Sequence, residues 1–507
     1  MRASSFRSSV RAIALLAVAA AVLGSASAST RPAGPRVIAD RGGWETFGNG
    51  NSRYSVASTS RVTASNAHRL RLAWSRGIGG VAVAQPLFLS AIAVRGRPVD
   101  IYVAASESGS VRAFRARDGL LLWKRNVGVV RTRCNQLPGG TFGVTGTPVF
   151  EPLVHGIFVA AVDRLWALDP STGRSLAGWP VKLPLDPTHE HAWGALTATG
   201  TGIYVPLASY CDRRPYDGRV LRVDTGSRAV TSSWSTVGSE KPGGGGIWGY
   251  GGLSVTADGH LFVATANANG AGITDDATGH AESVVELDPQ LRLLAASHAT
   301  GMPHRGDYGF GSTPVVFRPK GCPELVSAEG KDGIVYLWRR AALASGPVQR
   351  LRVALPATLY GLTSWDARTQ RLFLTTTAAL GNGPSGLNAL GIGPGCRLVR
   401  RWVRPLGGLL NSVPTLANDA VIVATGTGRL RVYSTRSGKA MVNRALGGPG
   451  FVAPIAVDDD VAAVTFGKRI VVYRLRRRWL GSSLGAFRAH RCVTASPSPG
   501  DHARRPA

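Results

Sequence analysis

The segment THEHAWGAL contains two histidines with the spacing of a metal-binding pair, His189 and His191, separated by Glu190. Residues two apart on a β-strand point to the same face, so both imidazole rings could reach one ion. No third histidine lies nearby in the sequence, and the segment begins the inner strand of a predicted repeat unit. We therefore predict that the pair lines a channel or a loop rather than holding a metal.

Five cysteines form the second group of reactive side chains. No two of them make a C-x-x-C motif, which excludes a zinc ribbon or a thioredoxin-like site, and there is no C-x-x-C-H motif for attaching haem. An odd number leaves at least one cysteine unpaired, and the cysteine in the polar tail is the natural candidate. The five are Cys134, Cys211, Cys322, Cys396 and, in the tail, Cys492.

The first 28 residues are organised as a secretory signal peptide. Arg2, Arg7 and Arg11 accompany an apolar run over residues 12–23, and small residues follow as far as Ala28. The run is shorter than the ~20 residues that span a bilayer, and no later stretch reaches that length. No cysteine near the cleavage site could carry a lipid. We therefore expect a secreted or extracytoplasmic protein, without a transmembrane segment after cleavage, in a compartment that permits disulfides.

The formal net charge of +29 does not by itself favour nucleic acid as a partner. Only seven of the 59 basic residues are lysines, and the arginines are scattered along the whole chain. The sequence has no basic stripe with interleaved aromatic residues, the pattern typical of nucleic-acid binding. The one dense run, Arg474 and Arg476 to Arg478, is interpreted as a solvated strand end rather than a contact for an acidic surface.

The elements that must position these side chains recur eight times from about residue 80. Each unit has a β-branched or aromatic strand, a Gly-containing turn and a second strand, and the units start 40 to 64 residues apart. Several units also have an upstream strand around a proline. The first strands begin at Ile101, Ile157, Ile203, Leu261, Glu324, Leu372, Val421 and Val461, the second strands at Val111, Leu165, Val220, Val284, Ile334, Leu387, Leu430 and Ile470, and the prolines are Pro86, Pro148, Pro314, Pro414 and Pro454.

Strands that are apolar on both faces cannot be buried within one unit, and this repeat length is typical of one four-stranded blade of a β-propeller. We predict an all-β, eight-bladed β-propeller over residues 81–480 that is a monomer. Residues 29–80, with the run Leu70 to Trp74, are expected to donate a strand that completes the last blade. Residues 481–507 are expected to form a flexible, polar, basic tail. The recurring D-x-x-T/S-G turns are explained by hairpin chemistry alone.

Several longer motifs resemble the pyrroloquinoline quinone (PQQ) repeat propellers. They are WETFGNGNSRYS from Trp44, GGGGIWGYGG around Trp248, ATANANG around Asn267, and PHRGDYGFGSTPVVF followed by GKDG from Pro303. The resemblance covers about residues 40 to 480. The family includes quinoprotein alcohol, methanol and glucose dehydrogenases, and a non-catalytic branch, the outer-membrane assembly lipoprotein.

The resemblance implies a cofactor site in the mouth of the central channel. Trp248 matches the tryptophan on which the quinone stacks, and Asn267 matches a Ca²⁺ ligand. The carboxylate ligand of Ca²⁺ corresponds to Asp212, with Asp217 as the other choice. Each position also has a structural interpretation: Trp248 as a plug between blades and Asn267 as a turn residue.

The same resemblance places Asp307 as the catalytic base and Lys331 as the cation beside the quinone oxygen. Ca²⁺ and a cation make a quinone a better hydride acceptor, while a carboxylate takes the hydroxyl proton of an alcohol. A loop cap and an ordinary turn lysine are the corresponding structural interpretations. The sequence departs from the family at Cys134, a single cysteine where alcohol and methanol dehydrogenases have two adjacent ones, and in GD where the base motif has WD.

Two hypotheses about function follow. The first is a PQQ- and calcium-dependent dehydrogenase that oxidises an alcohol or sugar. The second is a non-catalytic propeller that binds an extracytoplasmic protein, a glycan or a small molecule. Cys134 with Cys211, and Cys322 with Cys396, flank neighbouring blades and are candidate disulfides, although four cysteines allow three pairings.

Overall fold

The computed structural model describes residues 43–476, except 135–136, 138–139, 239–242, 269–278, 303–306, 357–362, 378–385 and 408–409. The expected signal peptide, the basic tail, Arg477, Arg478 and Cys492 lie outside the described residues. Within them, no helix has the length and apolar character needed to cross a membrane.

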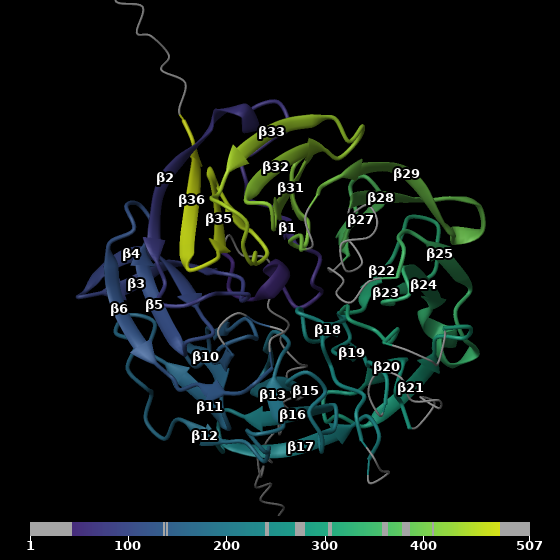
Figure 1. Ribbon diagram of the computed structural model, residues 1–507, viewed down its shortest axis with the longest axis horizontal. Helices are drawn as coiled ribbons and strands as arrows, with labels where there is room; N and C mark the ends of the chain where they lie inside the picture. The colour runs from purple at the N-terminus through teal and green to yellow at the C-terminus, as the bar shows by residue number, and fades with distance from the viewer. Residues whose placement is uncertain are drawn as a thin grey trace, which may run out of the picture.

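Eight antiparallel sheets are arranged around a central axis (Figure 1), which confirms the prediction of an all-β, eight-bladed propeller. In each blade the first strand lies beside the axis and the last lies at the rim. Blade 1 contains β3 (Leu87–Val94), β4 (Arg97–Ala105), β5 (Ser110–Arg115) and β6 (Leu121–Asn126). Blade 2 contains β9 (Val149–Glu151), β10 (Gly156–Ala161), β11 (Arg164–Leu168) and β12 (Val181–Lys182). A two-stranded hairpin between them consists of β7 (Val130–Arg131) and β8 (Thr141–Phe142).

Blade 3 has an inner strand in two pieces, both paired with the same neighbour. It contains β13 (Glu190–Ala192), β14 (Thr197–Thr199), β15 (Gly202–Ser209), β16 (Arg219–Asp224) and β17 (Ala229–Ser235). Blade 4 contains β18 (Ser254–Val255), β19 (Leu261–Ala264), β20 (Ser283–Leu287) and β21 (Leu293–His298). Blade 5 contains β22 (Val315–Phe317), β23 (Leu325–Glu329), β24 (Ile334–Arg339) and β25 (Gln349–Arg352).

Blade 6 contains β26 (Ser364–Asp366), β27 (Arg371–Thr376), β28 (Gly386–Ile392) and β29 (Leu398–Pro405). Blade 7 contains β30 (Thr415–Ala417), β31 (Ala420–Thr425), β32 (Arg429–Ser434) and β33 (Ala440–Ala445), with β1 (Val56–Ala57) added in parallel beside β30. The described 3₁₀ turns are η1 (Phe47–Asn49), η2 (Ala67–Arg69), η3 (Arg340–Ser345) and η4 (Pro394–Cys396).

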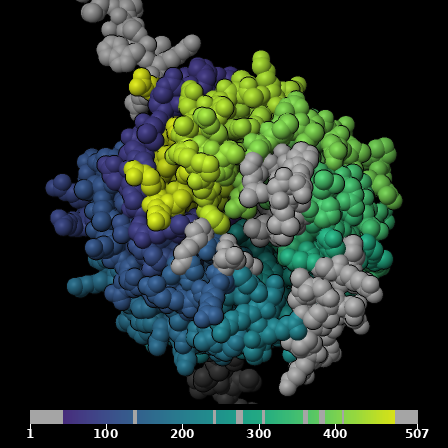
Figure 2. Space-filling model, in the orientation of Figure 1, coloured from purple at the N-terminus to yellow at the C-terminus, as the bar shows by residue number. Residues whose placement is uncertain are grey.

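Blade 8 combines the two ends of the propeller. It contains β34 (Ala456–Asp458), β35 (Val461–Phe466) and β36 (Arg469–Leu475), and its outer strand is β2 (Leu70–Gly77), which pairs antiparallel with β36. Figures 1 and 2 show this junction, where purple β2 lies beside yellow β36. The ring is therefore closed by backbone hydrogen bonds between segments about 400 residues apart in sequence.

Several second strands are buried along their whole length, because both of their faces pack against neighbouring blades. Every residue of β10 and of β15 is buried. Apolar side chains of adjacent blades form shared clusters, and Val103 of blade 1 packs in one cluster with Ile157 of blade 2. This explains why the repeat units read as continuous apolar runs rather than alternating ones.

Outer-strand tryptophans fasten each of three blades to the next. The Trp123 indole nitrogen of blade 1 donates a hydrogen bond to the Pro170 carbonyl of blade 2 (2.8 Å), and the ring covers Gly173, where a Cβ would overlap it. Trp74 makes the same arrangement with Ala116 and Gly119, where a Cβ would lie 2.6 Å from the ring. Trp402 repeats it on blade 7.

Residues 44–61 run around one end of the channel and contact the blades in order. Trp44 forms a β-bridge with Phe88 of blade 1, and the Glu45 carbonyl accepts a hydrogen bond from Phe150 of blade 2. Asn51 is hydrogen-bonded to Ala198 of blade 3 and Val255 of blade 4, and Tyr54 is hydrogen-bonded to Val316 of blade 5 and packs in a cluster with Trp365 of blade 6. The Ser55 carbonyl accepts from Leu416 of blade 7, and Arg61 forms an ion pair with Asp459 of blade 8. We call this segment the girdle. It lies where inner strands turn into second strands, so the opposite end, where second strands finish, is the channel mouth.

Candidate binding site at the channel mouth

Three of the predicted site residues are brought together at the ends of neighbouring blades. Lys331 follows β23 and its Nζ lies 2.5 Å from Asp307 Oδ1. The Lys331 backbone N–H donates to the Gly309 carbonyl (3.3 Å), and a Cβ at Gly309 would overlap the backbone nitrogen of Asn267. The glycine therefore allows the Asp307 segment to approach both Asn267 and Lys331.

The Asn267 side chain is an available polar group at this rim. The residue is 3% exposed, and its backbone carbonyl accepts from the Gly245 N–H (2.9 Å). Its amide makes no hydrogen bond within the part of the chain that the structure describes. Such an amide can donate to and accept from the polar groups of a bound ligand.

The two candidate carboxylates in YCDRRPYDG have different surroundings. Asp212 Oδ1 accepts a hydrogen bond from the Tyr216 hydroxyl at 2.6 Å. Burial raises the pKa of Tyr216 well above its ordinary value, with further contributions from the charges of Asp212 and Asp307. Both carboxylates are thus close enough to Tyr216 to affect its ionisation. Asp217 instead accepts hydrogen bonds from Ser235 and from the Val237 N–H, and burial raises its pKa.

Trp248 is enclosed by other aromatic side chains. It retains 7% exposure and meets Trp193 edge to face, with ring centroids 4.9 Å apart and an interplanar angle of 72°. Phe142, Tyr210 and Tyr216 belong to the same cluster. A stacked quinone needs one open indole face, whereas only 7% of Trp248 is exposed, so the planar cofactor implied by the resemblance would require the side chains around Trp248 to move.

The two histidines of THEHAWGAL are not directed at one ion. His189 precedes β13 and its Nδ1 lies 2.7 Å from Asp186 Oδ2, whereas His191, within β13, is fully buried. Glu190 between them forms an ion pair with Arg219 (2.7 Å). Among the described residues, no group of three or more His, Cys, Asp or Glu side chains is placed to hold a metal.

A buried chain of hydrogen bonds extends from His191 into blades 1 and 2. Thr145 Oγ1 donates to Glu107 Oε2 (3.0 Å), which also accepts from the Gly143 N–H (3.1 Å). His191 Nε2 lies 2.6 Å from Thr145 Oγ1, and the Tyr210 hydroxyl lies 3.3 Å from Nδ1. When Thr145 donates to Glu107, the matching arrangement has His191 donating to Thr145 through Nε2 and accepting from the Tyr210 hydroxyl through Nδ1.

Burial determines the protonation states of His191 and Glu107 in this network of hydrogen bonds. It lowers the pKa of His191 to about 3, so the imidazole is neutral at ordinary pH, and raises the pKa of Glu107 to about 8. Neither Glu107 nor Tyr210 was predicted from the sequence as part of the site. The available signal was a glutamate directly after the apolar strand IYVAAS.

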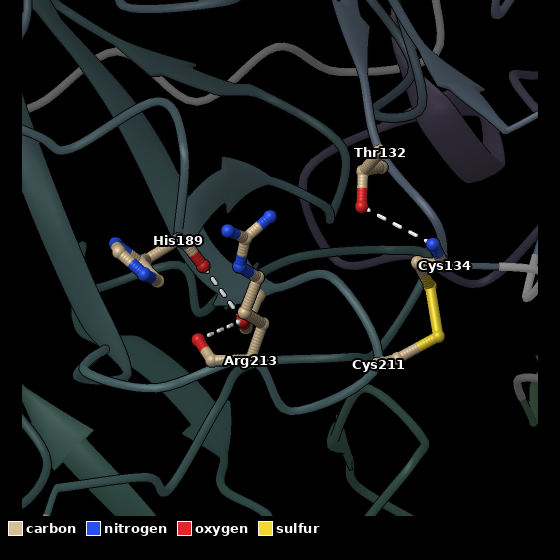
Figure 3. Close-up of a disulfide and its surroundings, with 6 residues drawn as sticks. Thr132, Cys134, His189, Cys211 and Arg213 are labelled. Atoms are coloured by element: carbon tan, nitrogen blue, oxygen red, sulfur yellow. Dashed lines mark hydrogen bonds between the residues drawn. A yellow bond between two sulfur atoms is a disulfide. The ribbon is translucent and has the colours of Figure 1, made fainter.

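Two disulfides connect separate parts of the propeller. Cys134 and Cys211 are joined (Figure 3), with Cα atoms 5.6 Å apart, which ties the loop of the β7–β8 hairpin to the turn after β15. Cys322 and Cys396 are joined with Cα atoms 5.8 Å apart and link blades 5 and 6. Figure 3 also shows His189 and Arg213, whose carbonyls both accept from the Ser209 hydroxyl near the first disulfide. Cys134 is buried in the aromatic cluster with Trp248.

Comparison with solved structures identifies the architecture. A quinohemoprotein alcohol dehydrogenase from Comamonas testosteroni superposes with a TM-score of 0.69 at 15% identity, over 87% of this chain and 82% of that chain. The fold is that of the quinoprotein alcohol dehydrogenases. A europium-containing methanol dehydrogenase gives 0.65 at 15% identity over 86% and 98% of the two chains. BamB from Moraxella catarrhalis gives 0.53 at 13% identity over 80% and 98%.

These similarities confirm the resemblance at the level of the fold. No protein-family model and no curated protein sequence matches the chain. Because both dehydrogenases and BamB share the architecture, the fold does not choose between catalysis and binding. The choice depends on the side chains at the mouth.

Proposed function

We propose that this protein is an extracytoplasmic binding propeller that takes a small polyhydroxyl compound, a sugar or polyol, at the channel mouth. The observation that carries the proposal is the Asn267 side-chain amide, which has no hydrogen-bond partner among the described residues and belongs to the same rim as the Asp307–Lys331 ion pair. Hydroxyl groups both donate and accept, so adjacent hydroxyls of a polyol complement an amide, a carboxylate and an ammonium group. The two disulfides support a location outside the cytoplasm.

The packing of Trp248 favours binding over quinone catalysis. Trp193 and the surrounding rings already cover the indole on which the cofactor would stack. Asn267 and Asp307 nevertheless offer oxygens of the type that Ca²⁺ prefers, while Asp212 is turned toward Tyr216.

Calorimetric titration of the chain from residue 29 with monosaccharides, disaccharides and polyols tests this proposal. We expect saturable binding of at least one compound and, in Asn267→Ala, a loss of affinity of roughly tenfold, because one buried hydrogen-bonding partner is removed. Asn443→Ala, at an exposed position of the outer strand β33, is the matched control and should bind as the wild type does. Failure of every compound to bind, or equal affinity in Asn267→Ala, would contradict the proposal and direct attention to a protein or glycan partner.

A PQQ- and calcium-dependent dehydrogenase is the second candidate, and the contact between Asp307 and Lys331 is what favours it. This activity requires the Trp193 ring to move away from Trp248, so that a quinone can stack on the indole. The test is reduction of an artificial dye by protein incubated with PQQ and Ca²⁺ in the presence of a panel of alcohols. Dye reduction by the wild type would establish this candidate, whereas binding of a sugar without dye reduction supports the binding propeller.

A further inference from the structure

A cavity of about 610 Å³ lies away from the channel mouth, where blade 8 meets blade 1. Blade 8 contributes β2, the end of β36 and the turn between β34 and β35, while blade 1 contributes β3, β4 and the turn after β5. We call this cavity the seam cavity, because it lies at the junction that closes the ring. Its volume is within the usual range for small-molecule sites.

Tyr102 contributes a hydroxyl-bearing side chain to the wall of the seam cavity. The residue lines the cavity and is 1% exposed, with its ring packed against Phe88 and Trp74. Its hydroxyl makes no hydrogen bond within the described ranges. Burial raises the pKa of Tyr102 above its ordinary value, and nearby carboxylates, Asp458 foremost, add to this effect. The hydroxyl is therefore a neutral group that can donate to a ligand.

Part of the charge around the cavity is already paired. Arg61 Nη2 lies 2.6 Å from Asp459 Oδ2 and 3.7 Å from Asp460 Oδ2. Arg474 lies 3.6 Å from Asp460. These pairs connect the girdle, the β34–β35 turn and β36, so they serve the closure of the ring.

Asp100 and Arg71 are exposed residues of opposite charge on the cavity wall, and neither has an ionic partner among the residues that the structure describes. Asp100 accepts a hydrogen bond from the Ala91 N–H (2.9 Å) and forms no ion pair. Within the described part of the chain, the Arg71 guanidinium donates only to the carbonyls of His68 (2.6 Å) and Leu70 (3.0 Å). Asp100 belongs to blade 1 and Arg71 to β2 of blade 8, so the two charges come from opposite sides of the junction.

We propose that the seam cavity binds a small zwitterion, an amino acid or a short peptide with free ends. Asp100 receives the ammonium group, Arg71 the carboxylate, and the Tyr102 hydroxyl a polar atom between them. Leu72, which is 58% exposed and lines the same cavity, offers apolar contact to the carbon skeleton. A ligand with a single charge would leave either Asp100 or Arg71 unmatched, which is why the zwitterion is preferred.

The test uses alanyl-leucine as the probe and isothermal titration calorimetry on the chain from residue 29. We expect saturable binding of alanyl-leucine and at least tenfold weaker binding of its N-acetylated, C-amidated form. Tyr102→Phe keeps the ring packing and removes only the hydroxyl, and it should weaken binding by roughly five- to tenfold. Asp100→Asn should weaken binding by at least as much.

Asn267→Ala is the control that separates this site from the channel mouth, and it should bind alanyl-leucine as the wild type does. Thermal unfolding of each variant verifies that the propeller is intact. The proposal is overturned if alanyl-leucine shows no saturable binding. It is equally overturned if the blocked dipeptide, Tyr102→Phe and Asp100→Asn all give the wild-type affinity.

Discussion

Two buried glutamates lie in the described chain without an ion-pair partner in it. Glu107 accepts from Gly143 and Thr145, and Glu329 accepts from the Thr363 hydroxyl. In each carboxyl one oxygen has no hydrogen-bond partner. Burial raises the pKa of both groups from 4.5 to about 8, so both are protonated at neutral pH. An acid of this kind stabilises the folded state only while it keeps its proton.

Stability should therefore fall as the pH rises from about 5 to 8. Because the folded-state pKa of Glu107 lies above its unfolded value, its contribution is complete below pH ~4.5 and is lost as the pH rises through about 8. We predict that Glu107→Gln flattens the pH dependence of the free energy of unfolding, by an amount on the order of a few kcal/mol between pH 5 and 8. Urea denaturation at each pH measures this.

Asp163→Asn, in the turn between β10 and β11, is the control and should retain the wild-type slope. Parallel stability curves for the wild type and Glu107→Gln would show that the carboxyl is solvated and ionises normally. Glu329→Gln should reproduce the effect independently, because Glu329 lies between blades 5 and 6 rather than between blades 1 and 2.

The order of the motifs along the sequence predicted Asn267, Asp307 and Lys331 as site residues, because each lies in a segment with a recognisable pattern. The contact between Trp193 and Trp248 was not predictable in the same way. The two residues belong to different blades, and the pattern of a strand gives the face on which a side chain lies but not the neighbour that covers it. The partners of Glu107 were hidden for the same reason.

At the scale of elements, the D-x-x-T/S-G turn is more than hairpin chemistry. Gly173 has a φ of +68°, and the Trp123 ring lies where its Cβ would be. The turn thus needs a glycine for its backbone conformation and again for the docking of the preceding blade. Gly321 has a φ of +75° but no atom within 4 Å of its would-be Cβ, so it shares only the first requirement.

Comparing Gly173 with Gly321 separates the contribution of tryptophan packing from the contribution of backbone strain. We predict that Gly173→Ala lowers the free energy of unfolding by about 2 to 4 kcal/mol, the sum of a positive-φ penalty and displacement of the Trp123 ring. Gly321→Ala should cost only about 1 kcal/mol, because it carries the backbone penalty alone. Urea denaturation followed by tryptophan fluorescence measures both. Equal losses in the two variants would mean that the tryptophan moves aside without cost.

The strand repeats were predictable because turn residues separate apolar runs at regular intervals along the chain. Two elements near the site were not predicted. The inner strand of blade 3 is interrupted between β13 and β14, at Trp193, and the β7–β8 hairpin that carries Phe142 is inserted between blades 1 and 2. Both depart from the repeat, so the regularity that identified the blades gave no information about them.

At the scale of the whole molecule, the girdle joins blades that are otherwise connected only to their neighbours. Arg53 is its central residue, with 0% exposure and no carboxylate partner in the described chain. Its guanidinium donates to the carbonyls of Phe47, Leu196 and Leu253, and to the hydroxyls of Thr46 and Thr197. Burial lowers its pKa to about 9, so it remains a cation at neutral pH and each of these charge-assisted bonds is strong.

Removing this side chain should therefore weaken the ring as a unit rather than one blade. We predict that Arg53→Ala lowers the free energy of unfolding by about 3 to 5 kcal/mol, because buried carbonyls lose their donor and a cavity is left in the channel. Arg436→Ala, at an exposed turn of blade 7, is the control and should change stability by less than about 0.5 kcal/mol. Limited proteolysis should then cut Arg53→Ala first within residues 43–61. If both arginine variants unfold at the same urea concentration and resist protease equally, the girdle does not hold the blades together, and the strand pairing of β2 with β36 closes the ring alone.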